Sequence, residues 1–183
     1  HDVANSINNI TGQSACKWLV MEWDGRESSG IFVGNPIGWL LRNVNSSLAL
    51  FKDNGIRSFS KVLIAIRPGR RNKRFIDVAD KICRHFGASL TLLNIVSETD
   101  SNQKIKRTEK SSTELISETK SKSVVKIIKS NNPVEAISEE SASYDLLILG
   151  TPEKDNWISV LFGAGEDRFV KKAACSVLRL TIK

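Results

Sequence analysis

The 183-residue sequence has few of the residues that build metal centres or disulfide frameworks. It contains three cysteines and two histidines, and the cysteines, Cys16, Cys83 and Cys175, lie far apart along the chain. An odd number of widely spaced cysteines does not form a disulfide framework. The two histidines, at positions 1 and 85, cannot complete a zinc-binding cluster with them. We therefore expect no metal site and a reducing, cytoplasmic environment.

Long apolar runs and enzyme motifs are also missing. No apolar run approaches the roughly 20 residues that a membrane-spanning helix needs, and no charged-then-apolar leader opens the sequence. With 40% hydrophobic and 7% aromatic residues, the composition is typical of a soluble globular protein. There is no phosphate-binding P-loop, no nucleophile elbow and no GxGxxG turn opening a βαβ unit. The sequence therefore predicts no catalytic residue and no enzyme activity.

Acidic residues are absent from the most basic part of the sequence. The formal net charge is +7, and residues 56–76 contain no acid but carry the basic residues Arg57, Lys61, Arg67, Arg70, Arg71, Lys73 and Arg74. A nucleic-acid-binding surface would add exposed aromatic residues or a basic helix face. The neighbours here form a buried apolar run instead, so we expect no nucleic-acid partner. Two interpretations stay open: a solvated basic loop, or an anion site or membrane-facing patch.

The sequence does contain an alternation of apolar runs and amphipathic segments. Nearly continuous apolar runs predict buried strands at 61–66, 89–96, 124–128, 145–150 and 176–182. Helical spacing of apolar residues predicts helices over 71–86 and 157–173, and Asn132-Pro133 predicts the start of another. Gly87 is placed to end the first helix. This order predicts an α/β fold, a doubly wound, open, five-stranded parallel sheet with helices on both faces.

One segment of this region is poor in apolar residues. Residues 97–122 contain no aromatic residue, and their large apolar residues are Ile105, Leu115 and Ile116. Such a segment cannot bury much surface on its own. We therefore predict a flexible insert at 97–122, with at most a short helix around Glu114.

The N-terminal third repeats the end of this unit. It is predicted to form a helix over 2–11, a strand over 17–22, a glycine-rich loop over 24–33, a helix over 34–42 and a strand over 47–51. Gly34 with Gly163, Leu41 with Val170 and Leu48 with Val177 share one offset of 129 residues. We therefore interpret residues 1–55 as the C-terminal half of a first α/β domain and residues 56–183 as a complete second one. On this interpretation the sequence is a fragment of a larger protein.

The predicted unit resembles the universal stress protein family. The resemblance is carried by the runs at 61–66, 89–96 and 145–150, and above all by ILGTPEKDNWISVLFGAGEDRFVKKAACSVLRL at 148–180. It implies the adenine nucleotide alpha hydrolase-like fold and a tandem pair of domains. The segment DNGIRSFSKVLIAIRPG at 53–69 is similar to the joint between two such repeats in the cytosolic tails of amino-acid permeases and cation:proton antiporters.

The resemblance also implies where a ligand would bind. In a doubly wound sheet, ligands bind beyond the carboxyl ends of the strands at the point where the winding reverses. The family's fold places this point between the first and fourth strands of the unit. The candidate nucleotide- or anion-binding residues are Arg67, Pro68, Gly69, Gly150, Thr151, Pro152, Gly163, Ala164 and Gly165.

Three departures from the family's pattern argue against ATP as the ligand. Members that bind ATP carry Gly-x2-Gly-x9-Gly-Ser/Thr, whose backbone N–H groups hold the phosphates. Here the pattern is Gly150-x2-Glu153-x9-Gly163-Ala164, so a carboxylate replaces the second glycine and the hydroxyl is lost. Arg67 stands where these members place an acid. No cofactor is required, and the alternative is that the basic loop holds another adenine nucleotide or a phosphorylated metabolite.

The resemblance leaves two functions open. One is a non-catalytic regulatory or ligand-sensing domain at the cytosolic face of a membrane transporter, with the membrane domain of the same polypeptide as its partner. The other is a free-standing tandem universal stress protein in the cytoplasm that binds ATP or another adenine nucleotide, with slow hydrolysis left open. In either case we expect a homodimer.

Overall fold

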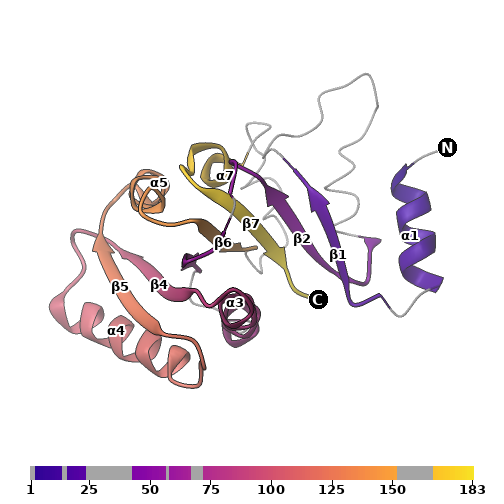
Figure 1. Ribbon diagram of the computed structural model, residues 1–183. Coiled ribbons are helices and arrows are strands. Elements are labelled where there is room, and N and C mark those ends of the chain that lie inside the picture. Colours follow the sequence, from indigo (N-terminus) through magenta and orange to yellow (C-terminus); the bar gives the residue numbers. More distant parts are fainter. Residues whose placement is uncertain (1–2, 14–15, 24–42, 57, 67–71, 152–166) are drawn as a thin grey trace.

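The computed structural model describes residues 3–13, 16–23, 43–56, 58–66, 72–151 and 167–183, which form a mixed sheet with helices packed on it (Figure 1). The strands are β1 (Trp18–Glu22), β2 (Ser47–Lys52), β3 (Lys61–Ala65), β4 (Ser89–Val96), β5 (Ser123–Lys129), β6 (Leu146–Gly150) and β7 (Ser176–Thr181). The helices are α1 (Val3–Gln13), α3 (Asn72–Phe86), α4 (Asn102–Ile116), α5 (Pro133–Ser141) and α7 (Arg168–Lys172).

The strand order in the sheet is β1-β2-β7-β6-β3-β4-β5. Strands β3 to β7 pair parallel to one another, which confirms the predicted α/β fold and its parallel sheet. Residues 62–65 of β3 and 146–149 of β6 are all apolar and all buried, as expected for parallel strands covered on both faces. Strand β1 pairs parallel with β2, and β2 pairs antiparallel with β7. The N-terminal strands therefore extend the five-stranded sheet at its β7 edge.

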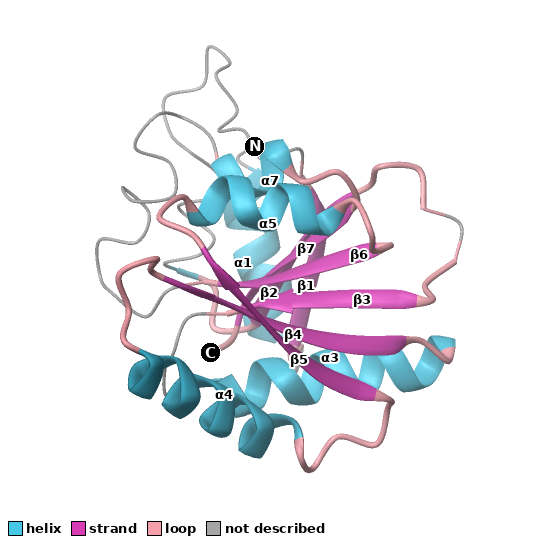
Figure 2. Ribbon diagram, turned by 90° about the vertical axis from the view of Figure 1, so that its left-hand side faces the viewer, coloured by secondary structure: helices cyan, strands magenta, loops and turns pink. Residues whose placement is uncertain are grey.

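Alternate side chains of the strands supply two cores, one on each face. On one face, Leu63 packs in a cluster with Ile137 of α5 and Val170 of α7. On the other face, Ile64 packs in a cluster with Phe75 of α3, and α4 joins the same cluster. Figure 2 shows α5 and α7 on one side of the sheet, with α3 and α4 on the other. A ligand site in this fold must therefore lie at the strand ends or between elements, because the sheet faces are covered.

Helix α3 confirms the helix predicted from apolar spacing. Its buried side includes Phe75, Ile76, Ala79 and Cys83, which recur at helical intervals. Gly87 follows the last helical residue with a φ of +67°, the left-handed conformation that commonly ends a helix. The predicted end of this helix is therefore correct.

The segment 97–122 corrects the prediction of a flexible insert. It contains the 15-residue helix α4, which crosses over between β4 and β5 and packs against both. Ser101 caps the helix because its side chain accepts a hydrogen bond from the Lys104 N–H. The buried side is narrow and partly polar, since the Asn94 amide donates to Ser112 Oγ at 2.9 Å. Counting apolar residues missed this helix because a hydrogen-bonded serine takes one of the inward positions.

Asp80 of α3 forms hydrogen bonds to the connection between α4 and β5. Its Oδ1 accepts hydrogen bonds from the Lys120 N–H at 3.0 Å, the Ser121 N–H at 2.9 Å and the Ser121 hydroxyl at 2.8 Å. Its Oδ2 lies 3.1 Å from Nε of Arg84, one turn along α3. Burial alone would raise the pKa of Asp80, but these hydrogen bonds and the Arg84 charge outweigh burial and hold the pKa below its ordinary value. The charged carboxylate is therefore the form that the fold favours.

The N-terminal part contains the helix and the two strands that its apolar spacing predicts. Helix α1 matches the predicted helix, and its Ile7 packs with Met21 of β1 and with Val44. Trp18 pairs with Ser47 across β1 and β2, as Leu146 pairs with Ser176 across β6 and β7. The predicted loop at 24–33 and helix at 34–42 lie outside the described residues.

Residues at the carboxyl end of β2 donate hydrogen bonds to carbonyl groups near the end of α7. The Lys52 ammonium group donates to the Val170 carbonyl at 3.0 Å, and the Asn54 amide donates to the Cys175 carbonyl at 2.9 Å. These are side-chain donors for carbonyl groups at and just beyond the helix C-terminus, where such groups lack partners within the helix. Side chains from the end of β2 and just after it thus supply hydrogen-bond donors to α7, which lies more than 100 residues later in the sequence.

Two of the three thiols are buried in the cores. Cys83 packs on the α3 face and Cys175 on the α7 face, whereas Cys16 is only half-buried. Burial is the main cause that raises the pKa of Cys83 and of Cys175 to about 11 from an ordinary 9.0. Cys83 is therefore a core residue, and neither buried thiol is suited to thiolate chemistry.

We expect a thiol reagent at pH 8 to label Cys16 first in the native protein. Raising the pKa of Cys83 and Cys175 from 9.0 to about 11 lowers their thiolate fraction at this pH roughly a hundredfold, and burial slows access of the reagent further. Mass spectrometry of peptides after brief iodoacetamide treatment measures the order of labelling. All three thiols should react in denaturant, and equal native rates at Cys83 and Cys16 would contradict this assignment of the core.

None of the helices in the described part of the chain is long and apolar enough to cross a membrane.

Candidate functional site at the switch point of the sheet

The winding of the sheet reverses between β3 and β6, as predicted. From β3 the chain proceeds through α3 to β4 and then through α4 to β5 on one side. It then crosses to β6 on the other side of β3, and β7 follows next to β6. Both strands at the reversal are parallel, so their carboxyl ends meet at the same edge of the sheet. This is where the doubly wound fold forms its ligand crevice.

Gly150 ends β6 at this edge, and its close surroundings favour a residue without a side chain. A Cβ added at this position would lie 3.2 Å from Ile66 Cγ2 at the end of β3 and 3.2 Å from the ring of Phe75 in α3. Such approaches are closer than ordinary van der Waals contact. The glycine lets the first turns of α3 pack closely against the end of β6.

Thr151 follows Gly150, and the structure gives its side chain a bonded partner. Its N–H donates to the Leu180 carbonyl at 2.9 Å, and its hydroxyl shares a hydrogen bond of 2.8 Å with the Thr181 hydroxyl. Both hydroxyls are buried between β6 and β7. Thr151 therefore positions the chain at the strand end, with its hydroxyl turned toward β7.

The other candidate residues lie outside the described residues: Arg67, Pro68, Gly69, Pro152, Gly163, Ala164 and Gly165. Of the predicted set, the structure places Gly150 and Thr151 together at the switch point. In the described part of the chain, no group of acidic, histidine and cysteine side chains is arranged to hold a metal ion.

A buried ion pair beside Gly150 was not predicted from the sequence. Arg179 of β7 is 4% exposed and Asp167 is fully buried, and Nη2 of the arginine donates to Oδ2 of the aspartate. The same aspartate caps α7 by accepting from the Phe169 N–H at 3.0 Å and the Val170 N–H at 3.3 Å. Arg179 Nε has no hydrogen-bond partner in the described part of the chain. The sequence signal for this pair was a lone charged residue, Arg179, in a strand whose other residues are uncharged.

Arg179 joins the two flanks of the candidate site. Its Nη1 donates to the Gly150 carbonyl at 3.1 Å while Nη2 contacts Asp167. The Arg179 side chain therefore bonds to both Gly150 and Asp167, although 16 residues of sequence separate those two. Arg179 also pairs with Leu50 across the β7–β2 junction. One buried side chain thus connects the strand end at the switch point, the start of α7 and the junction with the N-terminal strands.

Comparison with solved structures finds the same fold in universal stress proteins. The structure matches a universal stress protein from Archaeoglobus fulgidus DSM 4304 with a TM-score of 0.70 and 16% identity, over 97% of this chain and 64% of that one. The chain thus spans less than two thirds of that protein's length. A universal stress protein from Archaeoglobus fulgidus in complex with dAMP matches with a TM-score of 0.52 and 13% identity, over 68% of this chain and 100% of that one.

A universal stress protein in complex with cAMP matches with a TM-score of 0.54 and 16% identity, over 67% of this chain and 97% of that one. Comparison with curated protein sequences gives no match. Among family models, that of the Universal stress protein family matches residues 58–180, which is most of the chain and includes β3 to β6, nearly all of β7 and the switch point. The chain therefore belongs to the universal stress protein family.

Proposed function

We propose that this protein is a non-catalytic, ligand-sensing universal stress protein domain that binds an adenine nucleotide at the β3–β6 switch point. The observation that carries the proposal is the glycine at the end of β6, packed against Ile66 and Phe75 and fixed through its carbonyl to Arg179. Two proteins of the same fold are complexes with dAMP and cAMP, each of which carries a single phosphate group. A single phosphate is also the better match to a loop in which Glu153 replaces a glycine.

The site is proposed to differ from one built for ATP. Glu153, Ala164 and Arg67 replace a glycine, a hydroxyl residue and an acid of the ATP-binding pattern. A carboxylate near a triphosphate costs binding energy through like-charge repulsion. The basic residues at and after Arg67 suit an anion, which supports a nucleotide or phosphorylated ligand in place of magnesium-bound ATP.

We expect calorimetry to show weak or no binding of ATP with Mg²⁺, and tighter binding of dAMP or cAMP. Gly150→Val should weaken binding of the nucleotide by at least tenfold, because the added side chain displaces Ile66 and Phe75 at the switch point. Gly12→Val is the matched control, since a Cβ at Gly12 of α1 meets no atom within 4 Å. Micromolar binding of ATP with Mg²⁺ that is lost in Gly150→Val would contradict the proposal.

We further propose that residues 1–55 are the C-terminal half of a second universal stress protein unit. The β1–β2 pair has the register of β6–β7, and β2 and β7 meet antiparallel. Strand β1 is an edge strand whose Val20 is 66% exposed, which is the position that a neighbouring strand and helix cover in the complete unit. The chain is also longer than the dAMP-bound relative, because 68% of this chain is enough to cover all of that protein.

The proposed role of the two universal stress protein units is to regulate a membrane transporter in response to the bound nucleotide. This role rests on the similarity of residues 53–69 to the joint in transporter tails. A free-standing tandem universal stress protein is the alternative. In both cases the proposed assembly is a homodimer, and in the first the membrane domain of the same polypeptide is the partner.

A further inference from the structure

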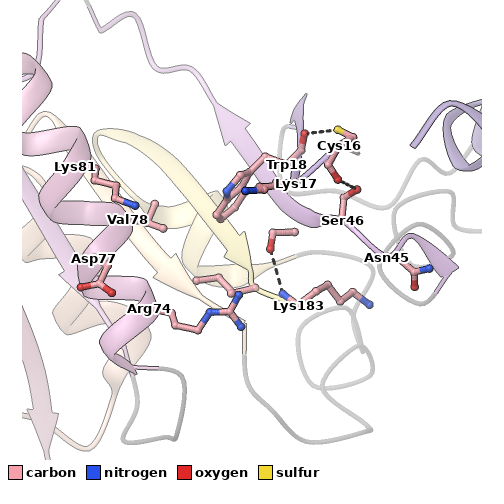
Figure 3. A pocket seen from close by; sticks show the side chains of 12 residues that line it. Cys16, Lys17, Trp18, Asn45, Ser46, Arg74, Asp77, Val78, Lys81 and Lys183 are labelled. Carbon is pink, nitrogen blue, oxygen red and sulfur yellow. Dashed lines mark hydrogen bonds between the residues drawn. The ribbon is translucent and has the colours of Figure 1, made fainter. Parts of the chain in front are cut away.

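A pocket lies between α3 and the amino ends of β1 and β2 (Figure 3). Its volume is about 490 Å³, which is within the range of small-molecule sites. The switch-point residues Ile66, Gly150 and Thr151 are not among its described lining residues. The pocket is therefore separate from the site proposed above, on the side where β7 meets β2.

The walls of the pocket are strongly cationic. Four cations line it: Lys17 precedes β1, Arg74 and Lys81 lie on one side of α3, and Lys183 follows β7. They come from three separate parts of the fold. The acid among the described lining residues is Asp77. Lys17, Arg74 and Lys81 form no ion pair within the described part of the chain. These three cations, with one carboxylate among them, leave a positive potential in the pocket that favours an anion.

The backbone that carries these cations is fixed by hydrogen bonds. The Ser47 N–H donates to the Lys17 carbonyl at 3.0 Å, and the Ser46 hydroxyl donates to the Cys16 carbonyl at 2.6 Å. The Lys183 N–H donates to the Ser47 hydroxyl at 3.2 Å, which ties the end of β7 to the start of β2. Ser46 and Ser47 are both buried. The floor of the pocket is thus organised without a ligand, which lowers the entropic cost of binding.

Apolar groups form the rest of the wall. The indole of Trp18 is half-buried, and Val78 of α3 and Ile182 after β7 also line the pocket. Figure 3 shows Arg74, Val78 and Lys81 on α3 across from Trp18 and Lys17. A flat or apolar group can therefore lie against Trp18 while an anionic group contacts the cations of α3.

We propose that this pocket binds a phosphorylated organic anion with an aromatic or apolar body. Arg74 would hold the phosphate through its planar fork of donors, with Lys81 and Lys17 adding charge. Trp18, Val78 and Ile182 contact the apolar body. This site is independent of the proposed nucleotide site, because it uses no residue of the switch point.

The test compares 1-naphthyl phosphate with inorganic phosphate by calorimetry and by amide chemical shifts in ¹⁵N-labelled protein. We expect naphthyl phosphate to bind at least tenfold more tightly, because inorganic phosphate cannot use the apolar wall. Shifts should occur at Lys17, Ser46, Ser47 and Ile182. The double variant Arg74→Gln/Lys81→Gln should weaken binding by at least tenfold.

The matched control is Lys106→Gln/Arg107→Gln, which removes the same charge from exposed positions on α4, away from the pocket. It should retain the affinity within twofold. Equal losses in the two double variants would show attraction to net charge alone and overturn the proposal. Absence of binding at millimolar naphthyl phosphate, or shifts confined to Gly150 and Thr151, would overturn it as well.

Discussion

Asp167→Ala is expected to lower the free energy of unfolding by about 3–5 kcal/mol. The substitution leaves the Arg179 guanidinium buried without its carboxylate, and it also removes the side chain that caps α7. A charge left unpaired in the interior costs far more than the loss of an exposed ion pair. Urea denaturation followed by circular dichroism measures the effect.

The exposed pair between Lys172 and Glu135 provides the matched control. Their charged groups are 2.7 Å apart, and both side chains are 47% exposed. Glu135→Ala should therefore cost no more than about 1 kcal/mol. The double variant Asp167→Ala/Arg179→Met should recover part of the loss, because it leaves no buried charge. If Asp167→Ala lowers the free energy of unfolding no more than Glu135→Ala does, the ion pair between Asp167 and Arg179 does not stabilise the fold as proposed.

Asp80→Ala is expected to lower the free energy of unfolding by about 2–4 kcal/mol near neutral pH. It leaves the N–H groups of Lys120 and Ser121 without their acceptor and Arg84 without its partner. The connection between α4 and β5 then loses its attachment to α3. Chemical denaturation at a series of pH values measures both the size of the loss and its pH dependence.

The pH dependence of this loss has a definite sign. The pKa of Asp80 is lowered in the folded state, so the contribution of the carboxylate is present above its ordinary pKa of 3.8. It is lost as the pH falls below 3.8 through the folded-state pKa. The difference between the wild type and Asp80→Ala should therefore shrink in acid. Asp77→Ala, an exposed carboxylate on the same helix, is the control, and equal pH profiles for the two variants would contradict the role of Asp80.

The strands and the switch point were predictable because their residues carry a strong local signal. Residues 62–65 and 146–149 are apolar throughout, which is sufficient to predict strands buried on both faces. The spacing of Phe75, Ala79 and Cys83, followed by Gly87, defined α3 and its end. Since strands joined by helices form a parallel sheet, the position of the crevice followed from the order of the elements.

The parts that were not predictable depend on partners distant in sequence. Helix α4 has few apolar residues, and its burial becomes clear only when Ser112 is seen to bond Asn94 of β4. Arg179 is unusual in a strand, but its sequence neighbours do not indicate that Asp167 and Gly150 are its partners. The antiparallel pairing of β2 with β7 likewise results from packing between distant segments. No local pattern reports such contacts.

The short helix α7 is held at both ends by other parts of the fold. Asp167, paired with Arg179, caps its start, while Lys52 and Asn54 donate to carbonyl groups at its far end. A five-residue helix has almost no stability of its own, so these contacts determine whether it forms. Removal of β2 from the sheet would therefore uncap α7 and release its attachment beside the crevice. The boundary proposed at residue 55 would divide two repeats, but the contacts that cross it predict that the residues on its two sides unfold together.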